Sequence, residues 1–211
     1  MTNLGALQGD WYSGAFGINA GGQIAGISRS FTDHAVVFYN GTITNLTALT
    51  GMAGGAQAIN DNGEVVGLGE LTGQLNGPCH AYDFTTKTDL GTLGGQNSDA
   101  YGINNSGQIV GYAATASGAW HPFLYSNGHM IDLGSFDDVY TAGTAFEINN
   151  AGQIVGDMEN PATGAYRAFL YSGGVTVHTP VDAASRRVSR RYPGLFARTK
   201  RRDAASTVAD P

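Results

Sequence analysis

The sequence predicts an all-β protein built from four repeated units, each with four short strands. The first observation is a block, Ile-Asn-x-x-Gly-(Gln/Glu)-x-x-Gly, which occurs four times at spacings of 41, 44 and 45 residues. The second is a short apolar stretch after every block, bounded by glycine, asparagine and serine, as strands are. The third is that no segment of residues 1–180 carries a sustained apolar stripe with the 3.6-residue period of a helix. We therefore expect helix to be nearly absent.

The first two strands of each unit come from the block itself. Strand one ends on its Ile-Asn pair, Asn-x-x-Gly forms a tight turn, and strand two carries the sequence after it, of which Gln-Ile-Val-Gly is the commonest form. Asparagine tolerates the left-handed conformation and glycine adopts a positive φ without a Cβ clash, so these residue types suit a hairpin turn. The blocks begin at Ile18, Ile59, Ile103 and Ile148.

The third and fourth strands follow the block. The third is a stretch of the type His-Ala-Phe-Leu-Tyr, at residues 34–39, 80–84, 121–125 and 167–171. The fourth is expected to carry a Leu-Gly-x-Leu segment, at Leu46–Leu49, Leu90–Leu93, Leu133–Phe136 and, in degenerate form, Val175–Thr179. A further copy of this segment opens the chain at Leu4–Leu7.

Four strands in about 40–45 residues is the size of one blade of a β-propeller. We therefore predict a β-repeat domain over residues 1–180, with units at 1–41, 42–86, 87–128 and 129–180. A small, four-bladed propeller is the favoured architecture, and a fragment of a larger one is the alternative. Two forms of the chain remain open: either Met1–Leu7 closes the ring as an exchanged outer strand, or the four units are part of a longer array.

The motifs also carry a family resemblance. The Gly91–Gly95 segment (Gly-Thr-Leu-Gly-Gly), the Ile-Asn block and the His-Ala-Phe-Leu-Tyr stretch, in this order over about residues 1–175, resemble the bacterial HAF family of extracellular repeats. The resemblance implies a secreted or cell-surface location and a repeat fold, and it brings no catalytic residues. The fourth unit departs from the family pattern because Arg167 stands in place of histidine. Met1 begins inside a repeat with no signal peptide, so a fragment or a cytoplasmic location is the alternative.

Charge is divided unevenly along the chain. Residues 1–181 hold 14 acids and 3 bases, a net charge of −11, whereas residues 182–211 hold 8 bases and 3 acids, a net +5. An acidic body is a poor ligand for nucleic acid, so we expect none to bind the repeat domain. The basic tail, residues 181–211, is predicted to be disordered. No apolar run is long enough for a membrane span.

Neither a metal nor a cofactor is predicted. The single cysteine, Cys79, allows no internal disulfide and no paired-cysteine metal site. The recurring histidines His34, His80 and His121 favour one structural hydrogen bond per unit over a metal ring, since the fourth position is Arg167. Phosphate-binding loops, nucleophile elbows and zinc-protease motifs are all missing from the sequence.

Loop lengths predict which end of the domain binds ligands. The turn between the first two strands is constant, whereas the loops between strands two and three, and between successive units, vary and share one end of the sheets. Aromatic and acidic residues concentrate there, and such residues suit sugars, whose apolar faces stack and whose hydroxyls donate. A structural role in solubility and packing is the alternative for each. The candidate binding residues are Asp10, Trp11, Tyr12, Phe31, Asp33, Trp120, Asp137, Asp138, Tyr140 and Tyr166.

These observations predict a non-catalytic binding or structural module of a bacterial secreted or surface protein. Its expected partner is a polysaccharide or another surface protein. The alternative is a carbohydrate-active hydrolase or lyase that uses loop carboxylates such as Asp137, Asp138 or Asp10. A purely architectural array without a ligand is the third possibility. The ligand's identity and the oligomeric state do not follow from the sequence.

Overall fold

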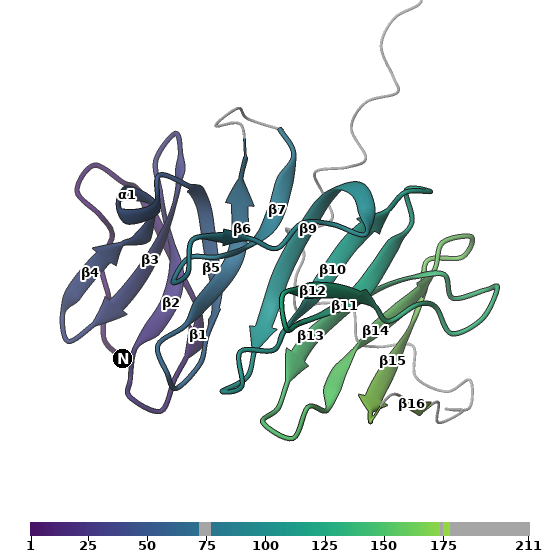
Figure 1. Ribbon diagram of the computed structural model, residues 1–211. Coiled ribbons are helices and arrows are strands. Elements are labelled where there is room, and N and C mark those ends of the chain that lie inside the picture. Colours follow the sequence, from purple (N-terminus) through teal and green to yellow (C-terminus); the bar gives the residue numbers. More distant parts are fainter. Residues whose placement is uncertain (72–76, 174, 178–211) are drawn as a thin grey trace, which may run out of the picture. The chain divides into compact units, whose positions relative to one another are not determined.

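The protein is an array of four antiparallel four-stranded sheets (Figure 1). The structure, a computed structural model, describes residues 1–71, 77–173 and 175–177, all of which belong to the unit Met1–His178. The all-β prediction is confirmed, while the basic tail lies outside the described residues. None of the helices in the described part of the chain is long and apolar enough to span a membrane.

Strands follow one another in chain order within each sheet. The first sheet holds β1 (Tyr12–Ile18), β2 (Ile24–Arg29), β3 (Asp33–Tyr39) and β4 (Thr42–Asn45), and the second holds β5 (Ala53–Ile59), β6 (Val65–Glu70), β7 (Cys79–Asp83) and β8 (Thr88–Asp89). The third holds β9 (Gly94–Ile103), β10 (Ile109–Thr115), β11 (Trp120–Ser126) and β12 (His129–Asp132). The fourth holds β13 (Ala142–Ile148), β14 (Ile154–Asn160), β15 (Ala165–Ser172) and β16 (Val175–Val177).

The repeated asparagine organises the turn between the first two strands of every sheet. In the third sheet, Asn104 Oδ1 accepts from the backbone N–H of Gln108, while Asn104 Nδ2 donates to Gln108 Oε1 at 2.8 Å. Gly107 takes the left-handed conformation with a φ of +72°, and its N–H donates to the Asn104 carbonyl. The block therefore recurs as Asn-x-x-Gly-(Gln/Glu) because the turn needs all three residues. The asparagine and the glutamine or glutamate supply side-chain hydrogen bonds, and the glycine supplies the positive φ.

A β-bulge explains the glycine that ends each block. The pairing of the first two strands shifts register at Phe16, Gln57, Tyr101 and Phe146. Beside this bulge the strands approach closely, and a Cβ on Gly111 would lie 1.9 Å from the carbonyl oxygen of Asp99. Gly26, Gly67 and Gly156 meet the same obstruction at 2.0–2.1 Å. No other residue type fits these positions without moving the backbone.

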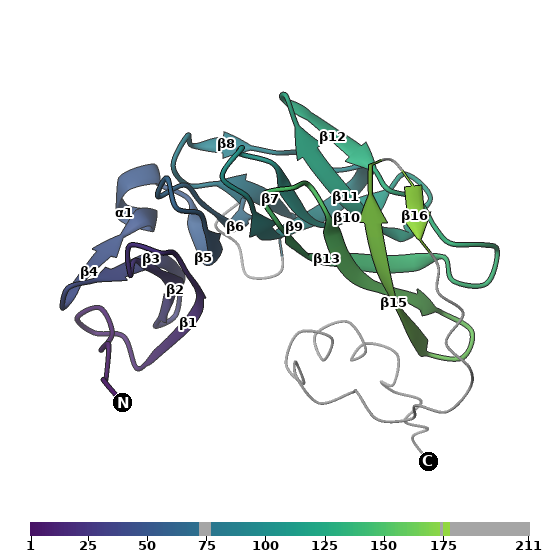
Figure 2. The same ribbon diagram turned by 90° about the horizontal axis from the view of Figure 1, so that it is seen from below.

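The fourth strands of the first three sheets are where the sequence prediction was wrong, whereas β16 lies within the segment predicted for the fourth sheet. These strands end before the leucine segment, at Asn45, Asp89 and Asp132, and the leucines leave the sheet. In the first unit the segment forms a five-residue helix, α1 (Leu46–Thr50), with Asn45 as its N-cap and Gly51 as its C-cap; Figure 2 shows it beside β3 and β4. In the second unit the N–H of Leu90 still donates to the carbonyl of Ala81 in β7, while its side chain packs into the core between the second and third sheets.

Each sheet packs its face against the following one. The first sheet contacts the second through β2 and β3, which pack on β5. The second contacts the third through β6 and β7, which pack on β9, and the third contacts the fourth through β10 and β11, which pack on β13. Within the described residues the first and fourth sheets do not pack against each other, so the four sheets do not close into a ring. Met1–Leu7 forms no strand, so of the two alternatives left open by the sequence the exchanged outer strand is not observed.

Candidate binding surface

Three exposed aromatic residues of the first sheet lie together at the end predicted to bind. Trp11 and Phe31 are 65% and 89% exposed, and their rings meet edge to face with centroids 5.3 Å apart. Tyr12, also exposed, lies under the guanidinium of Arg29 at 5.6 Å. Because these large exposed rings are in contact with one another, they form the candidate binding surface of this end. We call Trp11, Tyr12, Phe31, Arg29 and Asp33 the aromatic surface.

Sheet register places Tyr12, Arg29 and Asp33 of the aromatic surface side by side, while Trp11 and Phe31 lie in the adjoining loops. Tyr12 pairs with Arg29, and Arg29 pairs with Asp33 across the next hairpin. Arg29 forms an ion pair with Asp33 through two nitrogens, and Nη2 lies 2.7 Å from Oδ2. The hydrogen bonds to Asp33 raise the pKa of Arg29 despite its partial burial. The pair therefore offers a fixed arrangement of donors and acceptors beside the aromatic rings.

Asp10, the fifth candidate of this region, has a structural role instead. Its side chain is 4% exposed, and its Oδ2 accepts from Ser28 Oγ at 2.6 Å and lies 3.1 Å from His34 Nδ1. Burial would raise the pKa of Asp10, but these hydrogen bonds outweigh it and hold the pKa below its usual value. Asp10 therefore supports the loop from beneath and is not available to a ligand.

The other five candidates belong to later units and do not join the aromatic surface. Trp120, half-buried, packs against Tyr112 with ring centroids 5.1 Å apart. Asp137 Oδ1 accepts from the N–H groups of Val139 and Tyr140, both at 2.8 Å, which shapes the loop before β13. Asp138 lies exposed in the same loop, Tyr140 lies under the guanidinium of Arg167, and Tyr166 is in β15 beside Glu159.

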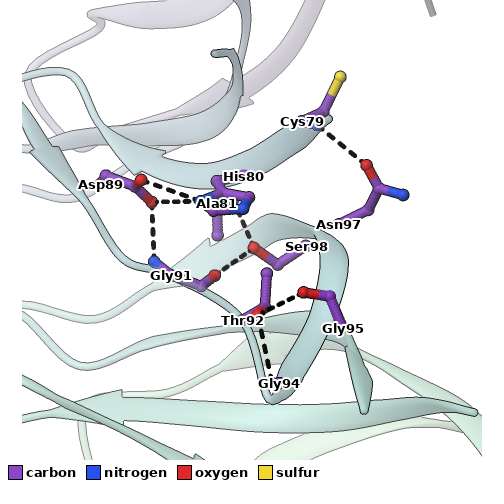
Figure 3. A network of polar contacts seen from close by, with 10 residues as sticks. All are labelled: Cys79, His80, Ala81, Asp89, Gly91, Thr92, Gly94, Gly95, Asn97 and Ser98. Carbon is purple, nitrogen blue, oxygen red and sulfur yellow. Dashed lines mark hydrogen bonds and ion pairs between the residues drawn. The ribbon is translucent and has the colours of Figure 1, made fainter. Parts of the chain in front are cut away.

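The recurring histidines each hold an aspartate, as the sequence predicts. His80 Nδ1 lies 2.7 Å from Asp89, which also accepts from the N–H of Gly91 (Figure 3). His121 and Asp132 repeat this contact at 2.9 Å, and His34 uses Asp10. Arg167 packs over the Tyr140 ring at 4.8 Å instead. Among the described residues, no three His, Cys, Asp or Glu side chains are grouped so that they could hold a metal ion.

Sequence reasoning missed two features. Arg29 was not among the candidates, although it is one of only three bases in residues 1–181, and that scarcity was a usable signal. The second feature is a buried polar cluster on the third sheet, where Asp99 Oδ1 and the Tyr101 hydroxyl lack a hydrogen-bond partner. Burial raises the pKa of Asp99 to about 8. No pattern in the sequence marked this cluster, because it depends on burial between sheets.

A cavity of about 430 Å³ lies at the opposite end of the sheets, between the first and second. Its lining includes Gln23, Thr44 and Lys87 beside apolar side chains such as Leu46 and Phe84. Lys87 Nζ donates to the carbonyl oxygen of Leu49 at 3.1 Å. This cavity is therefore at the end of the constant turns, whereas the exposed aromatic residues are at the end of the variable loops.

Comparison with known proteins gives one structural similarity. No family model and no curated protein matches the chain. The solved structure of TolB from Acinetobacter baumannii is similar, with a TM-score of 0.54 and 15% sequence identity over 79% of this chain. The chain spans 43% of the length of that TolB chain. At this identity the similarity concerns the fold, an array of β-sheets, and not the ligand or the activity.

Proposed function

We propose that this protein is a non-catalytic binding module whose aromatic surface takes a glycan. The observation that carries the proposal is the contact between Trp11 and Phe31, two large rings exposed together beside the Arg29–Asp33 pair. Sugar rings stack their apolar faces on such aromatic residues, and their hydroxyls bond to charged groups that are already held in place. The pairing of Arg29 with Asp33 means that little side-chain entropy is lost on binding.

The proposal extends to the fold and the location. The four face-to-face sheets are interpreted as blades of a β-propeller, which the similarity to the β-propeller protein TolB supports. The resemblance to HAF repeats supports a secreted or cell-surface module. An array of this kind presents loops on a rigid scaffold, which suits a binding role.

The test is binding of the full chain to a panel of bacterial polysaccharides and oligosaccharides, followed by titration calorimetry on each hit. Trp11→Ala and Phe31→Ala are expected to weaken binding by about tenfold or more each, since tenfold corresponds to about 1.4 kcal/mol and truncation of a central aromatic contact costs about 2 kcal/mol. Tyr39→Ala is the matched control, because Tyr39 is as exposed as Tyr12 but ends β3 at the opposite end of the sheet.

Glycan binding that survives both Trp11→Ala and Phe31→Ala would move the site elsewhere, with the cavity near Lys87 as the next place to test. A third outcome is that no glycan binds, while the wild-type chain captures a protein that Trp11→Ala and Phe31→Ala no longer capture. The ligand of the aromatic surface would then be a protein. Release of reducing sugar from any polysaccharide of the panel would contradict the non-catalytic role and favour the hydrolase or lyase alternative.

A further inference from the structure

In the second, third and fourth sheets, one face packs against the preceding sheet. The equivalent face of the first sheet, which we call its outer face, is exposed. Ile18, the isoleucine of the first block, is 68% exposed, whereas its equivalents Ile59, Ile103 and Ile148 are 8%, 9% and 6% exposed. Ala15 is exposed too, while the matching alanines of the other units are completely buried. The later residues are buried because the preceding sheet packs on them. The first sheet therefore presents an apolar, unpartnered face of the kind that joins sheets inside this protein.

A hydrogen-bond ladder between the sheets ends at the same face. Asn19 Nδ2 donates to the carbonyl oxygen of Asn60 at 3.0 Å, and Asn60 Nδ2 donates to that of Asn104 at 3.0 Å. Asn104 Nδ2 continues the ladder to the carbonyl of Asn149 at 3.1 Å. Each of these three carbonyls also accepts from the glycine of its turn. Among the described residues, the Asn19 carbonyl accepts from Gly22 alone and so has room for one more donor.

The fourth sheet presents the opposite half of this contact. Asn149 Nδ2 donates to Gln153 Oε1 and has a second N–H with no acceptor among the described residues. Unlike its buried equivalents in the other units, Asn149 is exposed. Val155 on the outer face is 45% exposed, whereas Ala25, Val66 and Val110 at the same position of the other sheets are completely buried. The fourth sheet thus has the donor and the apolar surface, and the first sheet has the acceptor and the apolar surface.

We propose that these two faces bind each other between two copies of the chain, the fourth sheet of one copy packing on the first sheet of the other. In this contact, Asn149 Nδ2 of one copy donates to the Asn19 carbonyl of the second, and Val155 covers Ile18. Two copies form the contact twice and close one ring of eight sheets, four from each chain. The occupant is a second copy because the contact continues an interface that the chain already makes three times.

Two residues make this contact weaker than those within the chain. Glu147 stands on the outer face of the fourth sheet where the other sheets have Gly17, Ala58 and Gly102, and association partly desolvates its carboxylate. Ala20 stands where Asp61, Asn105 and Asn150 accept a backbone N–H from the preceding unit, so a second rung of the ladder is missing. We therefore expect a reversible dimer whose population depends on protein concentration.

The test is sedimentation equilibrium of the full chain over a wide concentration range. The expected result is a monomer of 21.9 kDa in exchange with a dimer of twice that mass. Ile18→Arg and Val155→Arg are each expected to abolish the dimer, and Asn149→Asp, which keeps the Oδ1 acceptor of its own turn, to raise the dissociation constant about tenfold. Leu49→Arg is the matched control because Leu49, on α1, is 61% exposed and lies on neither face.

Mixing the two arginine variants gives the sharper measurement. The Ile18→Arg chain keeps an intact fourth sheet and the Val155→Arg chain an intact first sheet, so a mixture forms one of the two contacts and regains a species of dimer mass. Circular dichroism and thermal melting show that each variant is folded. A monomer at every concentration, a dimer that both arginine variants leave intact, or a mixture that stays monomeric overturns the proposal.

Discussion

The side-chain amide of Asn60 donates to the carbonyl oxygen of Asn104 at 3.0 Å and so joins two turns that are 44 residues apart in sequence. Both asparagines also bond within their own turns, through the residue four positions later. One side chain therefore fixes the shape of a hairpin and its distance from the next sheet. The same asparagine recurs in every block because it meets both requirements.

Replacement of this asparagine separates its two roles. Asn104 and Asn149 make equivalent bonds in their own turns, but only Asn104 also reaches a following unit of the same chain. Asn104→Ala is therefore expected to lower the free energy of unfolding by about 0.5–1.5 kcal/mol more than Asn149→Ala, the net value of one hydrogen bond. Urea unfolding at concentrations at which the chain is monomeric measures both. Equal losses would show that the inter-sheet bond adds nothing.

Ser98 offers a second test of contacts between units. Its Oγ accepts from the N–H of Ala81 in the preceding sheet at 2.8 Å and donates to the carbonyl of Gly91 (Figure 3). We expect Ser98→Ala to destabilise the protein by about 1–3 kcal/mol, because it leaves a buried backbone N–H without an acceptor. Ser13→Ala is the control, since Ser13 occupies the same position in the first unit and its hydroxyl, among the described residues, bonds to the Gly5 carbonyl but to no preceding sheet. Thermal unfolding should separate the two variants clearly, and the hypothesis fails if Ser13→Ala costs as much.

The glycine after the bulge is expected to be intolerant of any side chain. A Cβ at Gly111 would overlap the carbonyl of Asp99, so Gly111→Ala must force the strands apart and should destabilise by about 3 kcal/mol or more. Gly118→Ala meets no atom within 4 Å and is strained only by its φ of +86°, for which about 1 kcal/mol is expected. Expression yield and unfolding midpoint compare them. Similar midpoints would contradict the close approach.

Asp99 predicts how stability changes with pH. Burial raises its pKa to about 8 in the folded protein, so the folded state holds a proton that the unfolded state has lost above its ordinary pKa of 3.8. Stability should therefore fall as pH rises from about 4 to 8, by at most about 1.4 kcal/mol per pH unit. Asp99→Asn should remove this slope and be the more stable form at pH 8.

The slope is best measured by urea unfolding between pH 6 and 8. Asp157, whose pKa burial raises to about 6, contributes in the same direction at lower pH and interferes least in this interval. Asp138→Asn, a change at an exposed loop carboxylate, serves as the control. An unchanged slope in the Asp99→Asn protein would show that this carboxyl is not the titrating group.

The repeats were readable because local chemistry enforces them. The Asn-x-x-Gly turn, the glycine beside the bulge and the paired histidines each satisfy a requirement inside one unit, so they leave a pattern in the sequence. The leucine segments were assigned wrongly because the sequence Leu-Gly-x-Leu suits two roles equally well. It can form a strand, or it can pack its leucines over the core outside the sheet. Leu90 packs over the core, and this role depends on its contact with the neighbouring sheet, which the local sequence does not show.

The candidate site was partly predictable for a similar reason. Loop length and aromatic content indicated Trp11, Tyr12 and Phe31, which the structure brings together. Asp10 was included because an acid in a loop resembles a ligand contact, whereas its burial against Ser28 and His34 is a tertiary property. Asp99 was not among the candidates for the complementary reason, since its raised pKa comes from burial in the folded protein.

The asparagine ladder has a consequence for how such a protein changes over evolutionary time. Every contact between neighbouring sheets joins an asparagine side-chain amide of one unit to a backbone carbonyl of the next. A gene segment that encodes one unit can therefore be duplicated or deleted in frame, and the units on either side of it still form the same contact. The number of units in such an array can then change by recombination without a change in the chemistry of the contact between neighbouring units.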